Sequence, residues 1–156
     1  MKKIIILIQI LTALTYFGQQ LTTNDLRMLR GLSCESYHNG YFKYVGKHSD
    51  VIIYRENDYQ IEYNTKNDEW VSIKMNWTEN CKYSFTYFNT NMIKLKQYIG
   101  DTIDVEIIAT DTIGYVYHSK YKKGGKAFDG KIVFLNDELS NSEKKKIKKK
   151  FESSKS

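Results

Sequence analysis

Apolar and polar residues alternate in short runs from residue 40 onward. The clearest run spans residues 70–77, where every second residue from Val71 to Trp77 is apolar. A period of two is typical of a β-strand with one buried face. The pattern predicts eight strands, at residues 41–45, 51–55, 59–63, 70–77, 81–87, 103–107, 114–118 and 128–135.

The segments that separate most of these runs are at most five residues long and rich in Gly, Asn and Asp. Such short connections favour hairpins, so neighbouring strands should be antiparallel. Eight consecutive strands with one apolar face each avoid exposed edges by closing. The sequence therefore predicts a mainly β fold, an eight-stranded up-and-down barrel or a strongly curved sheet. A two-layer sandwich is the alternative.

Helical patterns accompany the strands. Residues 22–32 begin with a capping cluster and place leucines at helical spacing, which predicts a short N-terminal helix. Residues 137–151 predict a polar, Lys-rich C-terminal helix. A helical turn is expected within residues 91–100, with Met92, Leu95 and Ile99 facing inward.

The N-terminus has the pattern of a secretory signal peptide. Lys2 and Lys3 precede an apolar run at residues 4–14, which is too short to span a bilayer as a helix. We therefore expect a signal peptide at residues 1–18, a single β-barrel domain at 19–136 and a basic helix or tail at 137–156. The mature chain should be periplasmic or extracellular, with no transmembrane span.

Export changes the interpretation of the two cysteines. In an oxidising compartment, Cys34 and Cys81 are expected to form a disulfide, and only one connectivity exists. The alternative is a reactive thiol or a metal site built from Cys34 and His38, but no second close-spaced ligand pair accompanies it. No metal and no cofactor are expected.

The basic character of the chain is concentrated at its C-terminus. The formal net charge is +6, yet residues 19–142 carry fifteen Lys and Arg against sixteen Asp and Glu. A block of six lysines within seven residues repels itself and predicts a solvated or frayed segment. The alternative is an arm that binds an anionic surface or an envelope protein, whereas no nucleic acid is expected. Its lysines would be Lys144, Lys145, Lys146, Lys148, Lys149 and Lys150.

Motifs across residues 34–135 resemble a group of small exported proteins from Bacteroidetes. They are Cys34, GYFKY (40–44), SDVIIYR (49–55), QIEY (60–63), Trp77, NCKY (80–83), TY (86–87), IG (99–100) and DGKI (129–132). Members of the group look like lipocalin-type small β-barrels of unassigned role, so the resemblance implies a barrel and supplies no catalytic residues. Lipocalins usually carry Gly-x-Trp near the first strand, whereas Tyr41 and Phe42 follow Gly40 here.

Some members of that group are labelled DNA topoisomerase IV. A topoisomerase subunit needs a far larger chain to hold a strand gate, and an exported protein does not meet DNA. The label is therefore not transferred.

Residues suited to catalysis do not cluster in the sequence. The three histidines form no helical metal-binding pair, and His48, Ser49 and Asp50 are adjacent, so strand geometry would point them to different faces. Asp104 and Glu106 share the polar face of a strand, where exposure is expected. No catalytic residue is assigned. A hydrolase that uses His118 or Glu106 is the weakest alternative.

These observations favour a non-enzymatic, exported barrel that binds a small apolar or amphipathic ligand. The alternative is a structural or interaction module of the cell envelope that acts through its surface or its basic tail. The aromatic side chains expected to line the interior are Tyr44, Tyr63, Trp77, Phe85, Tyr115 and Tyr117.

Overall fold

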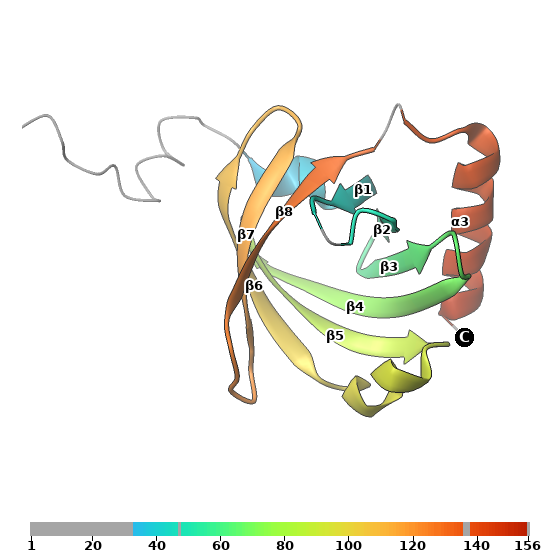
Figure 1. Cartoon of the computed structure of the whole chain (residues 1–156). Coiled ribbons are helices and arrows are strands. Elements are labelled where there is room, and N and C mark those ends of the chain that lie inside the picture. The colour runs from blue at the N-terminus through green and yellow to red at the C-terminus, as the bar shows by residue number, and fades with distance from the viewer. Residues whose placement is uncertain (1–32, 47, 136–137, 156) are drawn as a thin grey trace, which may run out of the picture.

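Eight antiparallel strands follow one another around a closed barrel, and the last strand pairs with the first (Figure 1). The computed structural model describes residues 33–46, 48–135 and 138–155. The mainly β fold and all eight expected strands are confirmed, and the barrel is closed. The strands are β1 (Gly40–Tyr44), β2 (Val51–Glu56), β3 (Tyr59–Asn64), β4 (Glu69–Glu79), β5 (Lys82–Thr90), β6 (Thr102–Thr110), β7 (Gly114–Tyr121) and β8 (Phe128–Phe134).

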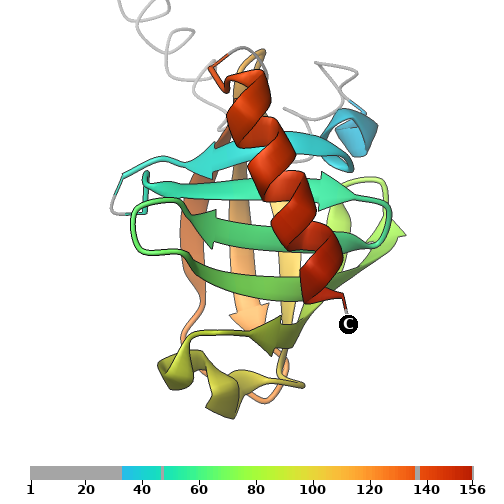
Figure 2. The ribbon, with the colours of Figure 1, turned by 90° about the vertical axis from the view of Figure 1, so that its right-hand side faces the viewer.

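A short 3-10 helix, η1 (Cys34–Tyr37), plugs one end of the barrel. The expected disulfide between Cys34 and Cys81 is present and joins η1 to the turn between β4 and β5. Tyr37 is buried, and its ring packs 4.8 Å from that of Tyr115 and 5.2 Å from that of Phe134. Figure 2 shows η1 at the same end as the β2–β3 and β4–β5 turns. This end is therefore filled by side chains.

The opposite end carries the β1–β2 loop, the β3–β4 turn and η2 (Ile93–Tyr98) (Figure 2). Met92 and Leu95 face the interior, as expected. Ile99 does not, since 46% of its surface is exposed. The segment is a 3-10 helix with three residues per turn, so Met92 and Leu95 share a face and Ile99 falls beyond it.

The C-terminal helix α3 (Asn141–Ser154) packs on the outside of the barrel, across β2 and β3 (Figures 1 and 2). Ser140 and Glu143 form a capping box that fixes its start, so the expected start at residue 137 is too early. Ile147 and Phe151 are fully buried against the barrel. The expectation of a frayed segment is wrong, because these two apolar residues anchor the helix, while most of its lysines are exposed to solvent as expected.

The outer face of β2 and β3 is apolar, and α3 covers it. Ile52, Tyr54, Ile61 and Tyr63 form a second hydrophobic cluster with Ile147 and Phe151 of α3. The placement of Tyr63 in the interior is therefore wrong. In β3 the alternation is inverted relative to expectation, and the polar residues Gln60 and Glu62 face inward.

The expected N-terminal helix at 22–32 and signal peptide at 1–18 lie outside the described residues. Within the described part of the chain, no helix has the length and hydrophobicity needed to cross a bilayer.

Candidate functional site

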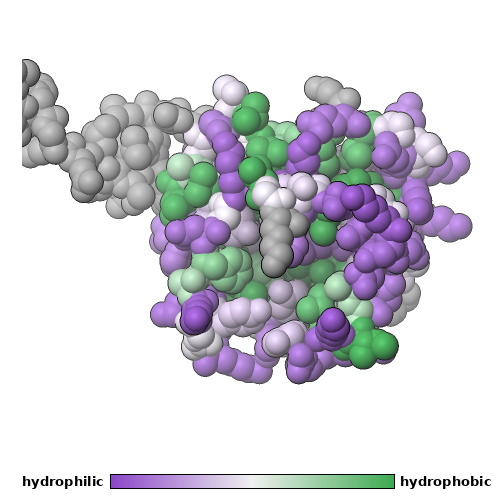
Figure 3. Space-filling view, viewed as in Figure 1, coloured by the Kyte–Doolittle hydropathy of each residue, from purple (hydrophilic) through white to green (hydrophobic). Residues whose placement is uncertain are grey.

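The barrel encloses a cavity of about 650 Å³ that opens at the end carrying η2. In the space-filling view this face is hollowed near its centre, with apolar side chains visible in the hollow and polar ones around it (Figure 3). Cavities of a few hundred to about 1,000 Å³ are typical of small-molecule sites. The walls are mostly apolar and aromatic: Val71, Phe85, Tyr87, Leu95, Val105 and Tyr117.

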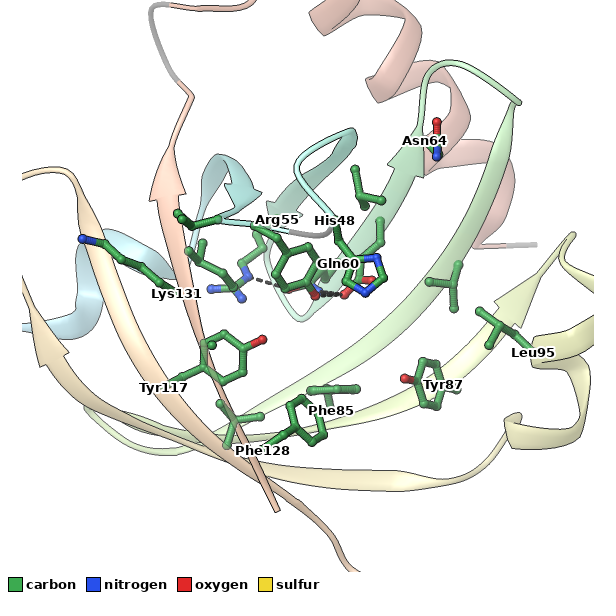
Figure 4. Close-up of a pocket in the computed structure, with 18 of the residues that line it drawn as sticks. His48, Arg55, Gln60, Asn64, Phe85, Tyr87, Leu95, Tyr117, Phe128 and Lys131 are labelled. Atoms are coloured by element: carbon green, nitrogen blue, oxygen red, sulfur yellow. Dashed lines mark hydrogen bonds between the residues drawn. The ribbon is translucent and has the colours of Figure 1, made fainter. Parts of the chain in front are cut away.

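Small residues on the inner face leave room for the cavity. Val71 and Val105 face inward from β4 and β6 and are almost fully buried. Gly130 of β8 lies opposite Tyr117 of β7, and a Cβ atom at Gly130 would come 2.4 Å from the Tyr117 hydroxyl oxygen. The Tyr117 ring lies across the backbone of β8 at this point, and any side chain at residue 130 would displace it. Figure 4 shows the hydroxyls of Tyr87 and Tyr117 pointing into the cavity from opposite sides.

A buried arginine lies at the floor of the cavity. Arg55 of β2 is 1% exposed, and its guanidinium donates to Gln60 Oε1 at 2.6 Å, to Tyr37 O at 3.0 Å and to the Tyr115 hydroxyl at 2.8 Å. It also donates to the Tyr83 hydroxyl at 3.2 Å. No carboxylate among the described residues lies within ion-pairing distance of it. These hydrogen bonds compensate the buried charge.

Aromatic rings add to this compensation. The guanidinium carbon of Arg55 lies 5.1 Å from the ring centre of Phe42, 5.3 Å from that of Tyr83 and 5.7 Å from that of Tyr115. Burial lowers the pKa of Arg55, but the neighbouring Tyr115 and Tyr83 hydroxyls outweigh it, and the pKa is raised overall. Arg55 therefore remains charged and held in place.

The carboxylate of Glu62 lies near Arg55, on the side of the cavity. Gln60 of β3 lies beside Arg55 (Figure 4) and accepts a hydrogen bond from it through Oε1. The Nε2 of Gln60 donates to Glu62 Oε1 at 2.9 Å, so Gln60 links the two charged groups. The Tyr44 hydroxyl donates to the same Glu62 oxygen at 2.6 Å. Burial raises the pKa of Glu62, although the Tyr44 hydrogen bond and the Arg55 charge oppose the shift. Burial also raises the pKa of Tyr44, and Glu62 adds to that effect.

The structure brings three of the six expected interior aromatics to the cavity. Tyr44, Phe85 and Tyr117 line it, whereas Tyr115 lies below, in contact with Arg55. Trp77 faces inward at the plugged end, where it stacks on His38 at 3.7 Å between ring centres. Tyr63 lies outside the barrel under α3, with its hydroxyl donating to Asp68.

Arg55, Gln60 and Glu62 were missed as site residues. Arg55 lies on the inner face of β2 with Val51 and Ile53. Because every second residue of a strand shares a face, this spacing could have indicated that Arg55 is a buried charge. Gln60 and Glu62 matched the polar, solvent-facing half of an alternating strand. The continuous apolar run Val51–Tyr54 was the available signal, since a strand with two apolar faces needs a cover on its outside.

Several lysines of the basic segment contact the barrel. Lys148 pairs with Glu56 at 3.2 Å and Lys150 pairs with Asp68 at 3.1 Å. Lys146 lies over the Tyr63 ring, with 5.6 Å between its Nζ and the ring centre. These contacts orient α3 on the acidic and aromatic surface of the barrel. The remaining lysines of the expected set, Lys144, Lys145 and Lys149, lie on the same helix, and Lys144 approaches the Tyr41 ring.

The residues considered for hydrolysis lie outside the cavity. His118 pairs with Asp129 at 2.7 Å, and 46% of its side chain is exposed. Glu106 lies beside His118 in the pairing of β6 with β7, and Asp104 pairs with Lys122 at 3.4 Å. Ser119, next to His118, is buried and points to the other face of β7. Ser119 therefore does not converge with His118 and Glu106.

No group of three His, Cys, Asp or Glu side chains suited to a metal occurs among the described residues. Comparison with known proteins adds no relationship: no protein-family model, curated protein or solved structure matches this chain.

Proposed function

We propose that this protein is an exported, non-enzymatic barrel, of the lipocalin-like kind that its motifs resemble, which binds a small amphipathic ligand in its interior. The observation that carries the proposal is the cavity of about 650 Å³, with apolar walls and a polar floor. An apolar ligand body gains free energy by leaving water, at roughly 25 cal/mol per Å² of buried surface. A polar end of the ligand would reach Gln60 and Glu62, which fix its orientation.

Two features support export. Lys2, Lys3 and the apolar run at residues 4–14 have the pattern of a signal peptide. The disulfide between Cys34 and Cys81 is of a kind that persists in oxidising compartments. The mass of the protein recovered from the periplasm or the medium of its host should lack about the first eighteen residues. A full-length mass, or recovery from the cytoplasm alone, would contradict export.

The ligand-binding proposal is tested by filling the cavity. Val105→Trp places an indole in the cavity, whereas Val116→Trp places the same side chain on the outer face of β7. We expect purified, unreduced protein to enhance the fluorescence of Nile red, a neutral apolar dye. The Val105→Trp variant should lose most of this enhancement, and the Val116→Trp variant should keep it.

Folding is checked in parallel by far-ultraviolet circular dichroism. If Val105→Trp does not fold, Val71→Phe, which adds bulk to the cavity from β4, replaces it. Equal dye binding by the wild type and a folded, cavity-filled variant would overturn the proposal, as would the absence of any binding by the wild type.

A further inference from the structure

Glu62 is the ionisable group that the cavity floor presents to a ligand. It lies in the middle of β3 inside a closed barrel, yet its side chain is only partly buried, because its exposed surface faces the cavity. Its Oε1 accepts two hydrogen bonds, from Tyr44 and Gln60. Among the described residues, Oε2 has no hydrogen-bond partner. A carboxylate oxygen therefore remains free to accept from a ligand.

Aromatic rings surround this carboxylate. Tyr44, Phe85, Tyr87 and Tyr117 line the same cavity from β1, β5 and β7. Burial raises the pKa of both Tyr87 and Tyr117, and the next cause in each case is the charge of Glu62, so this carboxylate acts on both side chains. Ring faces attract cations, and a carboxylate within an aromatic enclosure is a recurrent arrangement for binding ammonium groups.

Arg55 is less suited to bind an anion. Its surface is 1% exposed, and its donors are directed at Gln60, Tyr37, Tyr83 and Tyr115. Four of its five N–H groups are used in this way, so an anionic ligand would find at most one of them and would also approach Glu62. Lys131, in the middle of β8, directs its amino group away from the cavity (Figure 4) and pairs with Asp111 of the β6–β7 turn. Among the described residues, His48 and Glu69 line the cavity at its mouth.

We infer that the ligand is an organic amine that binds as an ammonium cation, with its nitrogen at Glu62 Oε2 and its apolar body between the aromatic walls. This inference rests on the proposed ligand-binding function and specifies its substrate class. The raised pKa of Glu62 agrees with it, because a buried carboxylate without a full counter-charge gains from a cationic partner.

Three probes of equal chain length separate the charge of the ligand from its apolar part: octylamine, octan-1-ol and octanoic acid. Their affinities are measured by isothermal titration calorimetry at neutral pH and low salt. We expect octylamine to bind about tenfold or more tightly than octanol, and octanoic acid to bind weakest. Glu62→Gln should lower octylamine affinity about tenfold and leave octanol affinity nearly unchanged.

Glu69→Gln is the matched control, since it neutralises a carboxylate at the mouth of the same cavity. It should change octylamine affinity by less than about threefold. The assignment to an amine would be overturned if octanoic acid bound more tightly than octylamine. It would also be overturned if Glu62→Gln and Glu69→Gln lowered the affinity for octylamine equally. If octanol binds and octylamine binds no more tightly, the assignment to an amine is wrong, whereas the proposal of ligand binding stands. Failure of all three probes would count against ligand binding itself.

Discussion

Arg55 and Glu62 are two ionisable residues inside the barrel, and their surroundings differ. Each brings a charged group into the barrel, and Gln60 connects them without a direct ion pair. Arg55 is almost fully satisfied by hydrogen bonds and ring faces, whereas Glu62 keeps one oxygen directed at the cavity. A buried polar network that is only partly satisfied costs folding free energy, and such groups are frequent in binding sites.

Glu62 should therefore make stability depend on pH. Burial raises its pKa in the folded chain above the ordinary value of 4.5, against the opposing Tyr44 hydrogen bond and Arg55 charge. Glu62 loses its carboxyl proton at lower pH in the unfolded chain than in the folded chain. The contribution of Glu62 to the stability of the fold therefore falls as pH rises from 4.5 through the pKa of the folded chain. Ionisation of Glu62 then destabilises the fold at neutral pH.

The variant Glu62→Gln removes this penalty while an amide oxygen still accepts from Tyr44. We expect it to raise the melting temperature at about pH 7.5, and the difference from the wild type to shrink at about pH 4. Thermal unfolding followed by circular dichroism at the two pH values checks this. A variant that is less stable at neutral pH, or a difference independent of pH, would contradict the expectation.

Among the elements, α3 changes the environment of the strands beneath it. Its charged residues make it a polar helix by composition, yet Ile147 and Phe151 lie one turn apart and bury completely against β2 and β3. Residues four apart share one helix face, so two apolar side chains are enough to dock the helix. Lys148 and Lys150 flank this apolar pair on the surface of the helix, and they pair with Glu56 and Asp68. Exposed pairs of this kind contribute little, so the docking is chiefly hydrophobic.

Truncation of Phe151 should show how much the helix contributes. Phe151→Ala removes a fully buried ring and should lower the free energy of unfolding by about 3–5 kcal/mol. Lys149→Ala, on the exposed side of the same helix, should change it by less than about 0.5 kcal/mol. Urea unfolding monitored by tryptophan fluorescence provides the measurement, since Trp70 packs against this cluster. Similar effects of the two substitutions would show that α3 is not docked in solution.

At the scale of the whole molecule, the two ends of the barrel differ. One end is closed by η1, which the disulfide fixes to the β4–β5 turn, and the other end opens to the cavity. The bond joins residues 47 apart in the sequence, so it restricts a long loop of the unfolded chain. In the chain-entropy model this stabilises the fold by about 4 kcal/mol.

Loss of the disulfide should therefore destabilise the whole barrel. The double variant Cys34→Ser with Cys81→Ser should unfold at lower urea concentration, by an amount corresponding to about 2–4 kcal/mol. The emission of Trp77 should shift to longer wavelength if η1 leaves the barrel, because His38 covers its ring. Reductant should have the same effect on the wild type and none on the variant. Equal stability of the two proteins in the absence of reductant would show that the bond is dispensable.

The sequence by itself determined the number of strands, their antiparallel order and the disulfide pairing. These features depend on local rules: a period of two marks a strand, short turns join neighbours, and two cysteines allow one bond. Only the tertiary structure decided which faces of β2 and β3 are interior. Both faces of β2 carry apolar residues, and the inner face became identifiable only when α3 covered Ile52 and Tyr54 on the other. The cavity likewise could not be read from any one strand. It is the space left when residues from all eight strands and η2 meet, and only that meeting brings Arg55, Gln60 and Glu62 to its floor.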